Sequence, residues 1–154
     1  RSSVLGDALR MARVHSGFWQ TEDHHPSAAR TLAQGTLWCG HGDIAMRIDM
    51  LGRKKATDSC CRAHDLCDDI MKGDTSKHGL TNTAAVTRLH CDCDAAFYHC
   101  LKDVEGDDTA KLVGEMFFNV IRTPCYKEEY PVIGCIRLDK YGRKKYQWFD
   151  NPEF

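Results

Sequence analysis

The sequence lacks several features that would assign it to a broad class of proteins. It has no apolar run of the ~20 residues that a membrane-spanning helix needs, no internal repeat and no N-x-S/T sequence. It also lacks an excess of either charge, since 21 basic and 22 acidic residues leave a net charge of −1. We therefore expect no nucleic-acid partner, and we interpret the short basic runs at 53–55 and 143–145 as solvated surface. No serine lies in a G-x-S-x-G sequence, which argues against a serine lipase.

Cysteine, by contrast, is abundant, with nine residues in a chain of 154. A chain of this length fits one domain, and so many cysteines in one domain predict a disulfide framework formed in an oxidising compartment. We therefore expect a secreted, extracellular protein. The odd number leaves one cysteine over, either as a free thiol or as a link to another chain.

A zinc-stabilised interaction module is an alternative use of the cysteines. Zinc ligands of the right types occur at Cys60, Cys61, His64 and Cys67, and again within residues 90–93. The spacing fits poorly, because adjacent cysteines do not readily bind one ion and zinc sites usually show separated pairs of ligands. The disulfide interpretation is favoured, and a count of free thiols would separate the two.

The stretch DSCCRAHDLCDD, residues 58–69, has the spacing of a helix. Thr57 or Asp58 could cap a helix that begins near Ser59. Residues four and seven apart share a helix face. One face then carries Cys60, His64 and Cys67, and an adjacent face carries Cys61, Asp65 and Asp68.

A second helix is predicted over residues 86–104, where apolar residues recur with a 3.6-residue period, and Gly106 is a plausible end. The two helices contain cysteine pairs of equal spacing. If the helices are antiparallel, one register allows both Cys60–Cys100 and Cys67–Cys93 bridges. His64 would then lie between the bridges, with Asp94 on the second helix as a candidate partner.

His64 and Asp94 together suggest acid–base chemistry. A histidine is a suitable general base when a carboxylate fixes its tautomer and stabilises the imidazolium. A purely structural histidine is the commoner interpretation of an isolated pair. Asp65, next to His64, and the glycine-rich stretch at 35–43 shift the balance toward function.

The stretch GTLWCGHGD, residues 35–43, can turn backbone carbonyls inward because its glycines allow positive φ. Carbonyls and a carboxylate suit Ca²⁺, which takes ~6 to 8 oxygen ligands. A Cys39–Cys61 bridge would hold this loop beside Asp65. The candidate ligands are the carbonyls of Trp38, Gly40 and Gly42 and the carboxylate of Asp65. Taken alone, the glycine loop is more often an ordinary turn.

These stretches, with SKHGLTNTAAVTRLHCDCDAAFYHCLK and YQWFD, resemble the group III secretory phospholipases A2 of the bee-venom type. The combination of CCxxHDxC and HCDCD is specific, and the resemblance covers residues 35–154. It implies a fold that is mainly α with a small β component: two antiparallel disulfide-bridged helices, a calcium loop and a C-terminal β-hairpin. Residues 1–34 would be an N-terminal extension, read as a pro-segment, a packed element or a lipid-contacting one.

The resemblance also implies an activity, the calcium-dependent hydrolysis of the sn-2 ester of glycerophospholipids at a membrane or micelle surface. His64 would be the base, Asp94 its orienting partner and the Gly40 N–H an oxyanion donor. The implied metal ligands are Trp38, Gly40, Gly42 and Asp65. The implied disulfides are Cys39–Cys61, Cys60–Cys100, Cys67–Cys93 and Cys91–Cys125. A secreted ligand of a receptor or ion channel, built on the same scaffold, is the alternative function.

The sequence departs from the family pattern at two positions. Phe117 stands where the bee-venom enzymes have a tyrosine whose hydroxyl helps to hold the aspartate, so we expect modestly altered activity. Cys135 is left without its usual partner, so it is a free thiol or joins a disulfide-linked partner chain. Residues 131–149 predict a strand, a turn near Gly142 and a second strand.

Overall fold

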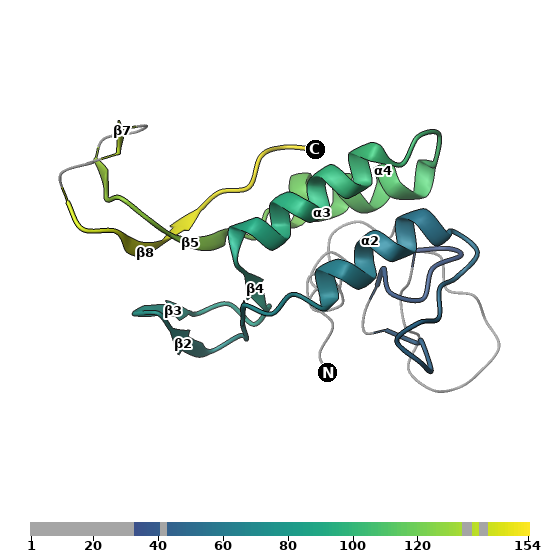
Figure 1. The fold of residues 1–154 in the computed structure, drawn as a ribbon, viewed down its shortest axis with the longest axis horizontal. Helices are drawn as coiled ribbons and strands as arrows, with labels where there is room; N and C mark the ends of the chain where they lie inside the picture. Colours follow the sequence, from purple (N-terminus) through teal and green to yellow (C-terminus); the bar gives the residue numbers. More distant parts are fainter. Residues whose placement is uncertain (1–32, 41–42, 134–136, 139–141) are drawn as a thin grey trace.

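The computed structural model describes residues 33–40, 43–133, 137–138 and 142–154. Two helices, α2 (Lys55–Asp65) and α3 (Cys91–Asp103), lie side by side and antiparallel at the centre of the described structure (Figure 1). The small antiparallel strand pairs lie toward one end of the helices (Figure 1), so the fold is mainly helical with a small β component. Among the described residues, no helix is both long and apolar enough to cross a membrane.

Helix α2 begins four residues earlier than predicted. Lys54 is the N-terminal flanking residue and offers no side-chain cap, so the prediction that Thr57 or Asp58 caps the helix is wrong. Both residues lie inside the helix, and both are buried. Their side chains make tertiary hydrogen bonds instead: Thr57 donates to Asp107, and Asp58 accepts from the backbone of residues 37 and 38.

Helix α3 is shorter than the predicted span of 86–104. His90 caps its start by accepting a hydrogen bond from the Asp92 N–H at 3.1 Å. The residues before it form a strand, β4 (Arg88–Leu89), which pairs with β1 (Ile70–Met71). The pairing of β4 with β1 and the His90 cap therefore fix the start of α3, although the apolar period of the sequence extends back through β4. At the other end Val104, rather than Gly106, follows the last helical residue.

Two further helical segments follow α3. Helix α4 (Asp108–Gly114) runs directly into a π-helix, η1 (Glu115–Ile121). Arg122 ends the π-helix in the left-handed conformation, with φ of 52°. Single π-helical turns often occur at functional sites, and this one places Phe117 and Phe118 in the core beside α3.

The C-terminal part contains the predicted hairpin, with a different first strand. β8 (Lys145–Phe149) pairs with β5 (Cys125–Glu129), from Cys125 opposite Phe149 to Glu129 opposite Lys145. The predicted partner, within residues 131–138, forms a separate short pair of β6 (Val132–Ile133) and β7 (Arg137–Leu138). A further hairpin, β2 (Thr75–Lys77) with β3 (Leu80–Asn82), extends away from the helices, beyond the end of α2 (Figure 1).

Four disulfides join these elements, and they have the pairing that the sequence implied. The bridges are Cys39–Cys61, Cys60–Cys100, Cys67–Cys93 and Cys91–Cys125. Cys67 lies beyond the end of α2, so the expectation that it shares a helix face with Cys60 and His64 is wrong. Because these eight sulfurs are oxidised, none of them is a thiolate for zinc. Cys135 and most of residues 1–34 lie outside the described residues. Of that predicted extension, Ala33 is buried in the core.

Candidate active site

His64 and Asp94 meet between the two central helices. His64 lies in the last turn of α2, and Asp94 lies in the first turn of α3. The His64 Nε2 and the Asp94 Oδ1 are 2.8 Å apart, and both side chains are almost fully buried. The other ring nitrogen, Nδ1, is buried and has no hydrogen-bond partner among the described residues. The pair therefore presents one ring nitrogen to the carboxylate and keeps the other available to accept a proton.

Two phenylalanine rings hold the imidazole in place. Phe97, three residues after Asp94 on α3, stacks on it at 4.2 Å between ring centroids with 18° between the planes. Phe117 meets it edge-on at 5.0 Å and 85°. These contacts fix the plane of the ring in an apolar environment, where an electrostatic interaction with Asp94 is stronger than in water.

A third polar residue, Asn151, completes the surroundings of Asp94. Its Nδ2 donates to the Asp94 Oδ2 at 2.6 Å and to the Thr123 carbonyl at 3.0 Å. Asn151 follows β8 by two residues and is 57 residues from Asp94 in the sequence. No periodicity or motif of the sequence marked it, because its role depends on where the C-terminal segment docks.

Asp58 is the second residue whose role the sequence did not reveal. Its buried carboxylate accepts hydrogen bonds from the N–H groups of Leu37 at 3.0 Å, Trp38 at 2.8 Å and Gly52 at 2.7 Å. The charge-assisted hydrogen bonds that this carboxylate accepts from Leu37 and Trp38 fix the start of the glycine loop on α2, and the one from Gly52 fixes the chain just before α2. The Trp38 indole adds a bond to the Met50 carbonyl at 2.8 Å.

The predicted metal ligands are brought together only in part within the described residues. The Cys39–Cys61 bridge attaches the loop to α2, and Asp65 lies one helical turn after Cys61, so both belong to the side of the helix that faces the loop. Gly40 is buried, and its N–H donates to the Trp38 carbonyl at 3.2 Å. Gly42 lies outside the described residues.

The donor set of this loop fits a hard cation. Its predicted ligands are backbone carbonyls and one carboxylate, which are the oxygen donors that Ca²⁺ prefers. The neighbouring cysteines are in disulfides and offer no soft thiolate. Among the described residues, no three His, Cys, Asp or Glu side chains converge, and a site built mainly from backbone carbonyls needs no such cluster.

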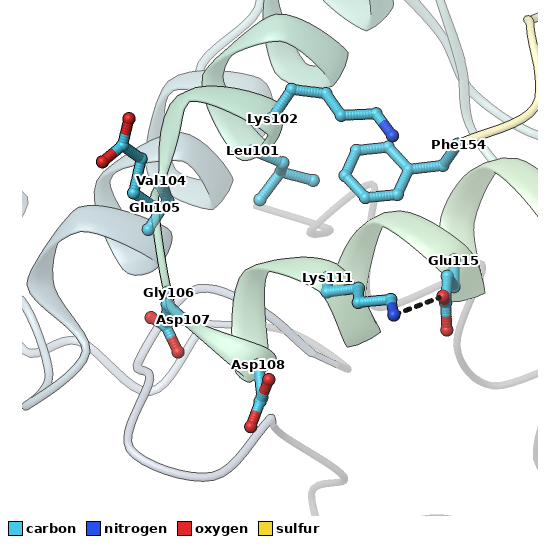
Figure 2. A pocket seen from close by; sticks show the side chains of 10 residues that line it. All are labelled: Leu101, Lys102, Val104, Glu105, Gly106, Asp107, Asp108, Lys111, Glu115 and Phe154. Carbon is cyan, nitrogen blue, oxygen red and sulfur yellow. Dashed lines mark ion pairs between the residues drawn. The ribbon is translucent and has the colours of Figure 1, made fainter.

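A pocket of about 410 Å³ lies at the far end of α3, away from the His64–Asp94 pair. Figure 2 shows its lining side chains, among them Phe154 and, below it in the view, the Lys111–Glu115 ion pair. The Lys102 Nζ lies 4.0 Å from the centre of the Phe154 ring. Neither His64, Asp65 nor Asp94 lines this pocket, so it is distinct from the candidate active site.

Apolar side chains are exposed in the loop that follows the glycine stretch. Every second residue from 44 to 50 is a large exposed hydrophobic, and Met46 and Ile48 are 89% and 57% exposed. The loop is tied to the site by two hydrogen bonds, from the Ile44 N–H to the Leu37 carbonyl at 3.0 Å and from Arg62 on α2 to the Ile48 carbonyl at 3.2 Å. The exposed chains are Ile44, Met46, Ile48 and Met50.

Comparison with known proteins identifies the class to which this fold and site belong. A model of the phospholipase A2 family matches residues 32–129, more than half of the chain. The chain therefore belongs to the phospholipase A2 family of enzymes, and the resemblance seen in the sequence is confirmed.

Individual relatives narrow the class to its group III branch. A phospholipase A2 of Apis dorsata is 54% identical over 126 residues, covering 75% of this chain and 94% of the relative. One of Apis mellifera is 46% identical over 160 residues, covering 96% of each. The isozymes PA3A/PA3B/PA5 of Heloderma suspectum are 45% identical over 98 residues, covering 64% of this chain and 68% of the relative.

Proposed function

We propose that this protein is an extracellular enzyme that hydrolyses the sn-2 acyl ester of glycerophospholipids with the help of Ca²⁺, releasing a fatty acid and a lysophospholipid. The observation that carries the proposal is the buried His64–Asp94 pair, in which Nε2 contacts the carboxylate and Nδ1 has no partner among the described residues. Membership in the phospholipase A2 family and the four disulfides support the substrate and the oxidising compartment.

In this mechanism His64 is the general base. Its Nδ1 accepts a proton from a water molecule while the water oxygen attacks the ester carbonyl. Asp94 holds the Nε2–H, so that Nδ1 is the unprotonated nitrogen, and it stabilises the imidazolium that forms. The same proton is then available for the leaving alkoxide. Water is the nucleophile, and no acyl-enzyme is formed.

The loop would supply the electrophilic side of the site. The carbonyls of Trp38, Gly40 and Gly42 and the carboxylate of Asp65 would hold Ca²⁺, which when bound supplies Lewis-acid stabilisation of the developing oxyanion. The Gly40 N–H would donate to the same oxygen. For this it has to leave the Trp38 carbonyl, a long contact of 3.2 Å within a tight turn.

The exposed loop at 44–50 supports a lipid surface as the physical form of the substrate. The polar neighbours Arg47 and Asp49 form an ion pair with each other, so their charges offset locally. Met46 and Ile48 are the most exposed large hydrophobic side chains of the loop. We propose that these two enter the bilayer when the enzyme binds it.

The experiment that tests the proposal is fatty-acid release from phospholipid vesicles labelled at the sn-2 position. We expect release in Ca²⁺, none in excess chelator, and a large loss in Asp65→Asn, with the exposed Asp68→Asn as matched control. Label released equally in chelator would overturn the calcium role. No release by a correctly bridged protein would favour the alternative of a receptor or channel ligand.

A further inference from the structure

The C-terminal segment 150–154 returns from the hairpin to the body of the protein. After β8 it runs back along α3 toward α4 (Figure 1). Its end is held by Asn119, whose amide donates to the Phe154 carbonyl at 3.2 Å and accepts from the Phe154 N–H at 2.7 Å. The Phe154 ring lies parallel to Phe118 at 6.0 Å. This docking leaves Asn151 at the side of Asp94 opposite the imidazole.

The orientation of the Asn151 amide follows from its partners. Both neighbouring atoms, the Asp94 Oδ2 and the Thr123 carbonyl oxygen, are acceptors only, so the NH₂ group has to face them. Each amide hydrogen therefore has one acceptor. The Thr123 carbonyl directs one N–H, which in turn aims the other at the carboxylate.

Asp94 needs this second donor because its surroundings offer little else. One carboxylate oxygen accepts from His64, and the two rings that pack on His64, Phe97 and Phe117, carry no hydrogen-bonding group. A carboxylate held at a single oxygen can rotate about its Cβ–Cγ bond. A donor on the second oxygen fixes its plane and satisfies a buried acceptor that would otherwise cost free energy.

We propose that Asn151 is a positioning residue for the proposed hydrolysis: it orients Asp94, and through Asp94 it sets the tautomer and direction of His64. This inference rests on the proposed function for its kinetic consequence, but its geometric part does not. Asn151 is then the part of the C-terminal segment that belongs to the active site, whereas Asn119 anchors the far end of the segment and makes no bond to Asp94.

The test compares Asn151→Leu with Asn119→Leu. Both substitutions remove an amide that anchors the C-terminal segment, but only the first removes a donor to Asp94. With a monomeric short-chain phospholipid, we expect Asn151→Leu to lower kcat about tenfold with little change in KM. The downfield ¹H NMR signal of the His64 Nε2–H should shift in this variant. Asn119→Leu should retain kcat and the signal.

Equal losses in both leucine variants would show that Asn151 only docks the segment, and an unchanged signal in Asn151→Leu would overturn the proposal. If Asn151→Leu does not fold, Asn151→Asp keeps the shape. Its carboxylate would repel Asp94 at neutral pH, whereas its protonated form can donate to Asp94. Activity relative to the parent should therefore rise as the pH falls, and a constant ratio would contradict the proposal. If the parent is inactive, the proposed function fails, but the NMR comparison still tests Asn151.

Discussion

The two partners of the proposed catalytic pair, His64 and Asp94, are held in different ways. His64 is on α2, and one disulfide to α3 lies on each side of it in the sequence. Cys60–Cys100 starts within α2, and Cys67–Cys93 starts just beyond its end. The far oxygen of Asp94 is held by a hydrogen bond from Asn151, on a segment that no described disulfide reaches directly. The described bridge that is nearest to Asn151 in the sequence, Cys91–Cys125, fixes the base of the hairpin. Covalent bonds thus set the distance between the helices, and hydrogen bonds set the angle of the carboxylate.

The glycine loop is held both by a disulfide and by hydrogen bonds. The Cys39–Cys61 bridge attaches it at one point, and Asp58 fixes the preceding backbone through the N–H groups of Leu37 and Trp38. A single bridge leaves the chain free to rotate about the linked residue, whereas the carboxylate constrains consecutive peptide groups. We therefore expect the bridges to govern the stability of the fold and the hydrogen bonds to govern the precision of the site.

The largest loss of stability is expected where the covalent bond is broken. Replacing both Cys60 and Cys100 by alanine removes a bridge between residues 40 apart in the sequence, which should lower the free energy of unfolding by about 3 kcal/mol. Urea unfolding of the purified variant measures the change. An undiminished midpoint would mean that packing of α2 on α3, and not the bridge, holds the helices together.

Asp58→Asn tests the hydrogen-bonded attachment of the loop. The amide would replace one acceptor with a donor that faces backbone N–H groups, so we expect a loss of about 2 kcal/mol in unfolding free energy. Weaker Ca²⁺ binding should accompany it, measured by calorimetry. The exposed Asp68→Asn is the matched control. Asp58→Asn with parental stability and calcium affinity would refute the role given to Asp58.

A smaller and pH-dependent effect is expected at Asp107, which links α2 to α4. Burial alone would raise the pKa of Asp107, but hydrogen bonds from Thr57, Lys54 and the Thr109 N–H outweigh it and lower the pKa to about 2. Because the folded pKa is depressed, the stabilisation is complete above the unfolded value of 3.8 and is lost as the pH falls through about 2.

The corresponding variant is Asp107→Asn. At neutral pH it should be less stable than the parent by roughly 1–2 kcal/mol, and the two unfolding free energies should converge in acid. Thermal unfolding followed at several pH values measures this. A difference that persists below pH ~2 would show that the contribution does not come from the ionised carboxylate.

The exposed loop at 44–50 gives the smallest effect on stability. Met46→Ser with Ile48→Ser should leave unfolding unchanged, because both chains are solvated. Vesicle hydrolysis should fall about tenfold, since bilayer burial of these side chains is lost, while hydrolysis of a monomeric substrate stays constant. Val132→Ser with Ile133→Ser, exposed on β6, is the control. Equal loss in both double variants would leave the loop without a special role.

The spacing of the cysteines in the sequence predicted the two disulfides that join the central helices. The equal spacing in Cys60/Cys67 and Cys93/Cys100 indicated one register for two antiparallel helices, and this placed His64 opposite Asp94. The family resemblance supplied the remaining two pairings. Helix boundaries were predicted less well, because Thr57 and Asp58 look like caps locally, but their side chains have stronger tertiary partners.

The long-range hydrogen bonds could not be predicted. Asn151 reaches Asp94 because β8 pairs with β5 and the chain then continues beside Asp94. Phe117 stands where the family that the sequence resembles has a tyrosine, and this departure predicted the loss of one hydrogen bond to Asp94. It gave no indication of which residue would supply a donor, since that depends on strand pairing, and the first strand of the hairpin was itself predicted wrongly.

The central claim is that His64 is the general base of a lipolytic site. The most direct test is to compare the parent protein with His64→Gln for sn-2 fatty-acid release from vesicles in Ca²⁺, after mass spectrometry has shown all four bridges in both. We predict at least a hundredfold loss in the variant, the range expected when a general base is removed. Release at the parental rate by His64→Gln would contradict the account.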